Sequence, residues 1–210
     1  MTEKEQLTEE KIAEAAREVF VEKGMDGARM QEIADKAGIN KSLLHYYFRT
    51  KEKLFAFIFS KLIHRIGGML GNIMQEGVSI ENKVKGFVDL YIDILLKNPF
   101  LPNFILNEVT RNPETIFEGF AAANIDPQKF FVPLENQLKA EGYHIDPRDF
   151  VINTLSMVIF PLAGRPILER IVFNGDKKAY KEYILSRKES IVKFVMSALQ
   201  GYKESGVGSR

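Results

Sequence analysis

The 210-residue chain contains no cysteine, so disulfide bonds and thiolate metal sites are excluded. Its three histidines, His45, His64 and His144, are scattered and show no metal-ligand spacing. The sequence also lacks the HExxH, GxSxG, P-loop and dinucleotide-binding motifs. These absences argue against an enzyme, and they predict no cofactor, no metal and a reducing compartment.

Long hydrophobic runs are also missing. The most apolar run, LFAFIFSKLI, covers about ten residues and includes Lys61, whereas a membrane-spanning helix needs about 20 apolar residues. The first residues, MTEKEQLTEEK, are charged, which is unlike a secretory signal. We therefore expect a cytoplasmic protein with no membrane partner.

The chain has no strong excess of one charge, because its formal net charge is +1 at pH 7. The charged residues are nevertheless distributed unevenly along the sequence. Residues 36–53 carry five basic side chains against Glu52 alone, namely Lys36, Lys41, Arg49, Lys51 and Lys53. A local basic patch of this kind suits contact with phosphate groups, and a solvated charged surface is the alternative.

Most segments of the sequence have the periodicity of a helix. Apolar residues recur at helical spacing in 8–23, which Gly24 ends, and again in 30–37, which ends before Gly38. Asn40 suits the N-cap of a helix over 41–48, and a last helix is predicted over 186–202. We predict an all-α protein with about nine or ten helices.

The stretch IADKAGINKSLL predicts two helices joined by a short turn that contains glycine, the pattern of a helix-turn-helix unit. At 100° per residue, Leu44, Tyr47 and Phe48 lie on one side of the second helix and can pack inward. The opposite side carries Lys41, Ser42, His45 and Tyr46, with Leu43 at the border. This side is too polar for a core and is available for contact with a partner.

These residues resemble a known family. The segment MQEIADKAGINKSLLHYYFRTKEKL is similar to the DNA-binding segment of the tetracycline-repressor (TetR) family of bacterial transcriptional regulators. The resemblance covers residues 8–56 and is highly specific. It implies a homodimer that places one recognition helix per subunit in successive major grooves of a near-palindromic operator.

The resemblance also implies roles for individual residues. Lys41, Ser42, Leu43 and His45 face the bases, while Tyr47 and Lys51 contact phosphates, assisted by Arg29 and Tyr46. Three positions depart from the family pattern: Leu43 replaces a usual Thr, His45 a usual Tyr, and Arg29 a usual Ser or Thr cap. The departures leave the operator sequence open.

The remainder of the chain predicts a helical body. We expect residues 1–54 to bind DNA, 55–204 to form a ligand-binding and dimerisation domain, and 205–210 to be a frayed tail. Candidate pocket residues, for which plain core or surface is the alternative, are Phe87, Tyr91, Phe104, Asn107, Glu108, Phe117 and Phe120. Candidate dimer-interface residues, for which internal packing is the alternative, are Phe150, Val151, Leu155, Val158, Ile159, Ile191, Phe194, Val195 and Leu199.

Within the long helix that follows residue 54, the segment GGMLG contains Gly67, Gly68 and Gly71. Such glycines suit either a close helix crossing or a hinge. Taken together, the features predict a ligand-responsive transcriptional regulator, a repressor in the first instance, whose effector is a small apolar or amphipathic molecule. The alternative is a helical small-molecule carrier or scaffold with no DNA role.

Overall fold

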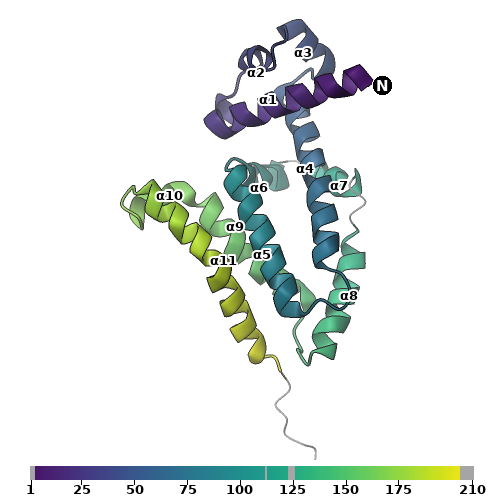
Figure 1. Cartoon of the computed structure of the whole chain (residues 1–210), viewed down its shortest axis with the longest axis vertical. Coiled ribbons are helices and arrows are strands. Elements are labelled where there is room, and N and C mark those ends of the chain that lie inside the picture. The colour runs from purple at the N-terminus through teal and green to yellow at the C-terminus, as the bar shows by residue number, and fades with distance from the viewer. Residues whose placement is uncertain (1–2, 112, 123–125, 204–210) are drawn as a thin grey trace, which may run out of the picture. The chain divides into compact units, whose positions relative to one another are not determined.

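A computed structural model describes residues 3–111, 113–122 and 126–203. Over these ranges the chain is all-α, as predicted, with no strand beyond an isolated β-bridge between Tyr143 and Lys203. The helices are shown in Figure 1 and are α1 (Glu3–Gly27), α2 (Met30–Lys36), α3 (Lys41–Tyr47), α4 (Lys51–Ile73), α5 (Ile80–Lys97), α6 (Leu101–Arg111), α7 (Pro113–Ala122), α8 (Pro127–Ala140), α9 (Pro147–Ala163), α10 (Arg165–Ile171) and α11 (Lys177–Gln200). Their number slightly exceeds the prediction because Gly164 alone separates α9 from α10.

The chain forms two compact units. The first unit comprises Met1–Gly68 and Asn98–Ile125, and the second comprises Met69–Lys97 and Asp126–Arg210. The division falls inside α4 and not at residue 54. The assignment of 1–54 to DNA binding and 55–204 to regulation stays a prediction, and the predicted tail at 205–210 lies outside the described residues.

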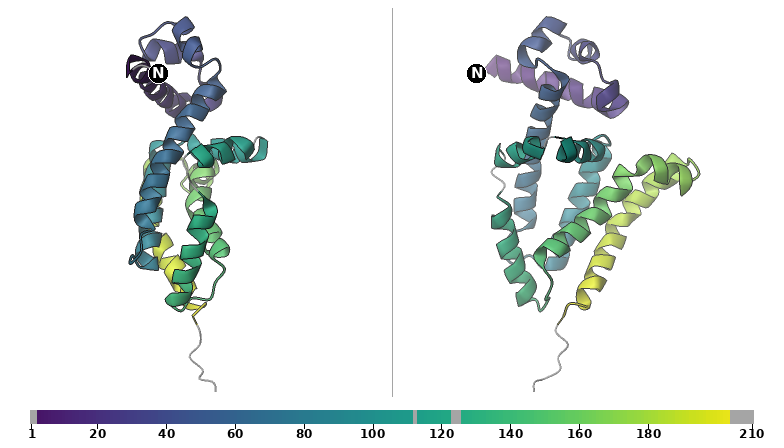
Figure 2. Two further views of the ribbon diagram at one scale, coloured as in Figure 1. Left: turned by 90° about the vertical axis from the view of Figure 1, so that its right-hand side faces the viewer. Right: turned by 180° about the vertical axis from the view of Figure 1, so that it is seen from behind.

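In the first unit, α1, α2 and α3 gather around the start of α4 (Figure 2). Gly24 interrupts α1 with φ +70°, the position at which the sequence predicts its end. The core is aromatic: the Phe20 ring centroid lies 5.5 Å from that of Phe55 and 6.1 Å from that of Phe100. Because Ile12, Ile33 and Leu44 are fully buried beside them, the short helices gain their stability from this shared core.

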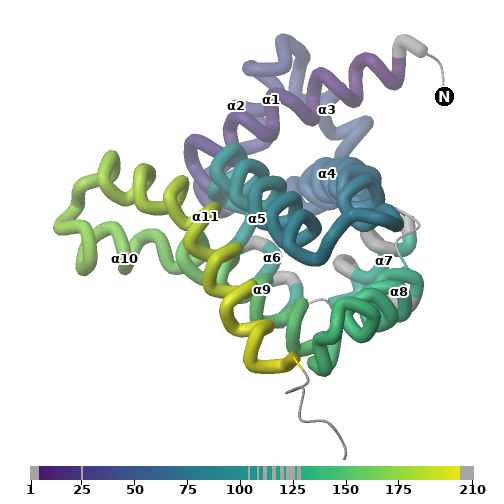
Figure 3. The backbone as a smooth tube through the Cα atoms, turned by 60° about the horizontal axis from the view of Figure 1, so that its bottom comes forward, coloured from purple at the N-terminus to yellow at the C-terminus, as the bar shows by residue number. Residues whose placement is uncertain are grey.

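In the second unit, α5, α9 and α11 lie side by side (Figures 1 and 3). Apolar residues at helical spacing, such as Val88 and Ile92 of α5 with Ile184 and Ile191 of α11, are buried between them. At the edge of this core, the Lys188 ammonium pairs with the Asp93 carboxylate at 2.7 Å and ties α11 to α5. Helix α8 packs against α9.

Helix α11 begins at Lys177, well before the predicted start at 186. The Asp176 side chain is the reason, because it accepts hydrogen bonds from the backbone N–H groups of Lys178 and Ala179, each at 2.9 Å. Gly175 precedes this cap with φ +82° and lets the chain reverse after α10. The predicted start at 186 rests on apolar periodicity, which does not reveal this cap.

Helix α4 is the one described helix whose length and apolar composition would allow a membrane span, with an 18-residue window of mean hydropathy 1.3. Helices α9 and α10 meet the same criteria only if joined across a 67° bend. In α4, Leu54, Phe55, Phe59, Ile63 and Ile66 are buried inside the protein, and 28% of the apolar window is buried.

Candidate nucleic-acid interface and regulatory cavity

The turn between α2 and α3 has the hydrogen bonds of a Schellman C-cap. Gly38, with φ +63°, donates its N–H to the Asp35 carbonyl at 3.0 Å, and Ile39 donates to the Ala34 carbonyl at 3.0 Å. The Asn40 side chain then caps α3 by accepting the Leu43 N–H at 2.7 Å. The cap predicted at Asn40 is therefore confirmed, and the two short helices have a defined turn between them.

Helix α3 separates its side chains as its periodicity predicts. Leu44 is fully buried and Phe48 is 6% exposed, so these two residues pack the helix onto the core. Lys41, Ser42, His45 and Tyr46 are exposed, and Leu43 is 37% exposed at the border. Tyr47 is half-buried, with its ring centroid 5.3 Å from that of Tyr46 in an edge-on contact. One side of α3 thus remains free to meet a partner.

His45 has a defined tautomer. Its Nδ1 lies 3.1 Å from the Arg49 carbonyl oxygen, and a carbonyl can only accept, so Nδ1 carries the proton. The neutral ring consequently presents Nε2 as an acceptor. Toward the bases, a neutral His45 in this conformation therefore accepts a hydrogen bond.

Arg29 and Lys51, both expected near phosphates, occupy different surroundings. Arg29 is exposed at the N-cap of α2, and its side chain makes no capping hydrogen bond. Lys51 is half-buried, and its Nζ donates to the carbonyl oxygens of Ala28 and Asp26 at 3.3 and 3.4 Å. Lys51 therefore also joins the start of α4 to the segment before α2.

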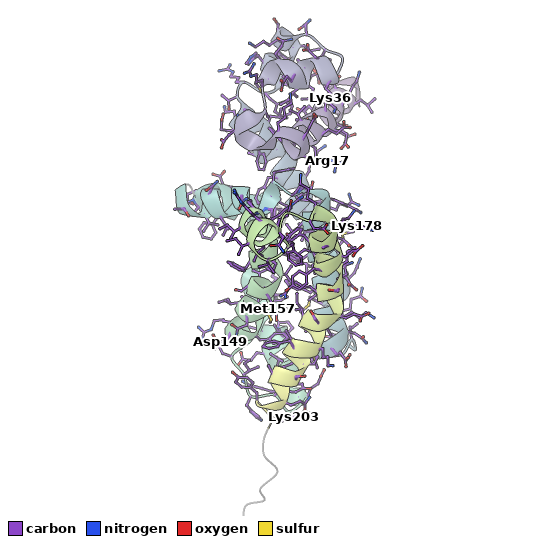
Figure 4. The ribbon with its side chains drawn as sticks, turned by 90° about the vertical axis from the view of Figure 1, so that its left-hand side faces the viewer. Arg17, Lys36, Asp149, Met157, Lys178 and Lys203 are labelled. Atoms are coloured by element: carbon purple, nitrogen blue, oxygen red, sulfur yellow. The ribbon has the colours of Figure 1, made fainter. Side chains whose placement is uncertain are left out.

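The basic patch is smaller than the sequence suggests. Lys36, labelled in Figure 4, pairs with the Glu18 carboxylate of α1 at 2.7 Å, and this hydrogen bond raises the pKa of Lys36. Within the described part of the chain, Lys41, Arg49 and Lys53 are exposed and form no ion pair. The uncompensated positive charge therefore lies on and just after α3.

The candidate pocket residues fall into the two units. Phe87 and Tyr91 stack within the second unit with ring centroids 4.5 Å apart, and burial raises the pKa of the Tyr91 hydroxyl. Asn107 and Phe117 belong to the first unit and are exposed. The side chains of Phe104, Glu108 and Phe120 lie outside the described residues.

A cavity of about 40 Å³ lies inside the second unit between α5, α8 and α9. Of the pocket candidates, Phe87 lines it, together with side chains that include Met74, Lys83, Val84, Phe130, Leu134 and Val151. Periodicity could not single out the apolar members of this lining, because an apolar residue at helical spacing has the same pattern whether it fills a core or borders a cavity. Lys83 was not predicted to lie here.

Most candidate dimer residues pack inside one chain. Phe150, Val158, Ile191, Val195 and Leu199 are each at most 8% exposed, so internal packing, the alternative, describes them better. Val151, Leu155 and Ile159 are half-buried, and Phe194 alone is largely exposed at 64%.

A different apolar surface is open on α9, α10 and α11. Large side chains protrude there with exposed fractions of 59–71%: Phe160, Ile167, Ile171 and Val172. Phe160 and Val172 line a groove of about 430 Å³ together with Met157, which is labelled in Figure 4. Large exposed apolar side chains beside a groove are typical of a protein–protein contact.

No group of three or more His, Cys, Asp or Glu side chains suited to a metal ion occurs among the described residues.

Comparison with known proteins gives consistent matches. Residues 12–58 match the family model described as bacterial regulatory proteins, tetR family. The chain is similar to the protein YttP of Bacillus subtilis (strain 168), with 22% identity over 179 residues, covering 82% of this chain and 86% of that protein. It is also similar to the HTH-type transcriptional regulator PksA of the same strain, with 33% identity over 107 residues, covering 51% of this chain and 44% of PksA.

Among solved structures, the transcriptional regulator FadR from Bacillus subtilis in complex with stearoyl-CoA superposes with a TM-score of 0.64 at 17% identity. The match covers 90% of this chain and 97% of FadR, so the similarity in fold extends well beyond the residues that the family model matches.

Proposed function

The chain belongs to the TetR family of bacterial regulatory proteins, and on this premise we propose that it is a cytoplasmic, ligand-responsive repressor that binds an operator as a homodimer. As an HTH-type transcriptional regulator it needs a surface that can enter a groove of DNA. The observation that carries the proposal is the division of α3: Leu44 and Phe48 are buried, while Lys41, Ser42 and His45 are exposed.

We assign direct contact with bases to Lys41, Ser42, Leu43 and His45. Two donors, one apolar side chain and one imidazole suit the mixed donor, acceptor and methyl pattern of the major groove. Tyr47 and Lys51 are assigned to phosphates, with help from Arg29 and Tyr46. For Lys51 this requires that a phosphate oxygen compete with the Ala28 and Asp26 carbonyls, whose distances of 3.3 and 3.4 Å mark weak hydrogen bonds.

The proposed dimer contact is the exposed apolar face of α9, α10 and α11. Phe160, Ile167 and Ile171 supply apolar area that a second copy would cover in an isologous contact. Two copies are required because a near-palindromic operator presents two half-sites related by a two-fold axis.

The proposed effector site is in the second unit, where Phe87 borders the cavity. The structure of FadR with stearoyl-CoA shows that a regulator of this fold binds an amphipathic ligand, and we extend ligand binding, not that ligand, to this chain. If effector binding weakens operator binding, the operator must weaken effector binding by the same factor.

The test is selection of duplex DNA from a random pool at two salt concentrations. The native protein is expected to enrich an inverted repeat and to bind it less tightly at high salt, because phosphate contacts release counterions. A protein carrying both Tyr47→Ala and Lys51→Ala is the control and should enrich nothing. Equal, weak binding by both proteins would overturn the proposed operator binding.

A further inference from the structure

Lys83 of α5 is the one charged side chain that is buried among the described residues, with 7% of its surface exposed. Its ammonium donates to the Gln137 Oε1 atom of α8, and no carboxylate in the described ranges pairs with it. A buried cation without a counter-ion is costly, and a single neutral amide compensates it only in part. Among the described residues of the second unit, the buried Lys83 ammonium therefore has a neutral amide as its partner and no carboxylate.

The orientation of Gln137 is set by its other contacts. Its Nε2 group donates to the Val78 carbonyl at 2.8 Å and to the Glu141 carboxylate at 2.7 Å, and both partners can only accept. The amide oxygen must then face Lys83. Glu141 in turn accepts the Ile80 N–H at 3.2 Å at the start of α5, so its Oε1 atom is already engaged.

The stem of Lys83 also lines the 40 Å³ cavity, whose other walls include Met74, Phe87, Phe130 and Leu134. These walls are apolar, and the polar Thr154 hydroxyl is engaged with the Phe150 carbonyl at 2.8 Å. The cavity is thus an apolar pocket, partly open to solvent, and Lys83 is the one charged residue among those that line it.

From this juxtaposition we propose that the second unit binds a monocarboxylate with an apolar body, with the body in the cavity and the carboxylate on Lys83. The inference rests on the proposed function as a ligand-responsive regulator and specifies the chemical class of its effector. A carboxylate supplies the one negative charge that Lys83 lacks, whereas an amine would be repelled and an alcohol would leave the charge uncompensated. A group with two charges would exceed what one ammonium compensates.

Ligand entry must move protein atoms. A cavity of 40 Å³ has room for a few water molecules, at about 10–15 Å³ each, and is far too small for an eight-carbon chain. The apolar body must therefore displace side chains such as Met74, Phe87 and Phe130, of which methionine is the most adaptable. Because Phe87 belongs to α5 and Phe130 to α8, binding separates these two helices and gives the ligand a preference for one conformation of the unit.

The first experiment is calorimetric titration of the full chain with straight-chain carboxylates from butyrate to dodecanoate, and with octanol and octylamine. We expect octanoate to bind about tenfold or more tightly than octanol, and octylamine to bind more weakly than both. Lys83→Met should abolish the preference for octanoate over octanol. The matched control, Lys85→Met on the exposed side of the same helix, should retain it.

A second variant keeps the test decisive if Lys83→Met does not fold. Gln137→Glu places an internal carboxylate beside Lys83, so it should remove octanoate binding. Its second oxygen faces the Val78 carbonyl and the Glu141 carboxylate in place of the Nε2 donor, so a lower Tm is expected. Three results would overturn the proposal: no carboxylate in the series binds, octanol binds as tightly as octanoate, or Gln137→Glu binds octanoate like the native protein.

Failure of this inference is separable from failure of the proposed function. Operator binding is measured without ligand, and Lys83→Met and Gln137→Glu are expected to leave it intact. If octanoate binds but does not release the operator, the carboxylate site is supported and ligand-responsive repression is contradicted. If the protein binds the operator and binds no carboxylate, the proposed regulatory function is supported and the effector class proposed for this cavity is wrong.

Discussion

At the scale of single residues, two side chains have their polar atoms directed by a backbone carbonyl. The His45 Nδ1 donates to Arg49 at 3.1 Å on the surface, and the Tyr180 hydroxyl donates to Pro161 at 3.0 Å in the core. In each case the carbonyl can only accept, so it decides where the proton lies. The first contact bears on the recognition of bases and the second on stability at alkaline pH.

We predict that His45 selects a base whose major-groove edge donates, which is adenine through N6 or cytosine through N4. Replacing that adenine by purine, which lacks the amino group, should weaken binding of the native protein by roughly 1–3 kcal/mol. His45→Ala should bind both duplexes equally. A preference for guanine at this position near neutral pH would contradict the assigned tautomer.

Tyr180 makes stability sensitive to alkaline pH. Burial raises the pKa of Tyr180 to about 12, and the neighbouring Glu169 adds to the shift while Arg165 opposes it. Because the folded pKa exceeds the ordinary value of 10.0, this contribution is complete below pH 10 and is lost as pH rises toward 12.

Chemical denaturation between pH 9 and 12 would measure this loss. Tyr180→Phe, which cannot ionise, should lose about 1 kcal/mol at neutral pH with its hydrogen bond and then show a flatter profile than the native protein. Parallel profiles for the two proteins would exclude Tyr180 as the source of alkaline sensitivity.

At the scale of elements, α4 contains glycines whose role the sequence leaves open. A Cβ atom added at Gly68 or Gly71 would meet no other atom within 4 Å, so the structure provides no close crossing there that demands glycine. The division between the two compact units falls directly after Gly68. Space around these two positions therefore does not require glycine, and the hinge stays a prediction.

Gly68→Ala tests the hinge. The substitution should stabilise the protein by up to about 1 kcal/mol, because alanine has the higher helix propensity and meets no clash. If Gly68 is a hinge, the effector should release the variant from the operator less effectively than it releases the native protein. Unaltered release, measured by fluorescence anisotropy of a labelled operator, would remove the hinge interpretation.

At the scale of the whole molecule, two copies of the chain are required for the proposed operator binding. The residues that periodicity favours for the dimer are largely internal, whereas Phe160 is 68% and Ile171 71% exposed. A stable interface buries about 1,200–2,000 Å² in total. Several large exposed apolar side chains on α9, α10 and α11 would supply part of that buried area.

We predict that Phe160→Glu converts the dimer into a monomer, because it places a charge inside an apolar contact. Light scattering after size-exclusion chromatography would measure the mass, and operator affinity should fall at least tenfold. Val132→Glu, which changes another exposed apolar residue, on α8, is the matched control and should remain dimeric. A dimeric Phe160→Glu protein would locate the interface elsewhere.

The sequence by itself determined the all-α class, the α2–turn–α3 segment, the Asn40 cap and the inward positions of Leu44 and Phe48. These features depend on local conformational preference and on a 3.6-residue period, and both are set by residues that lie close together in the sequence. The family resemblance was likewise concentrated in one continuous stretch.

Only the tertiary structure decided which apolar positions face a core, a cavity or an exposed surface. Val158 and Ile191 are buried in the core, Phe87 lines a cavity and Phe160 is open, although all four belong to similar helical patterns. It also brought Lys83 of α5 to Gln137 of α8 and Lys36 to Glu18. Periodicity specifies which side of a helix is apolar, and only the packing of distant segments specifies what that side meets.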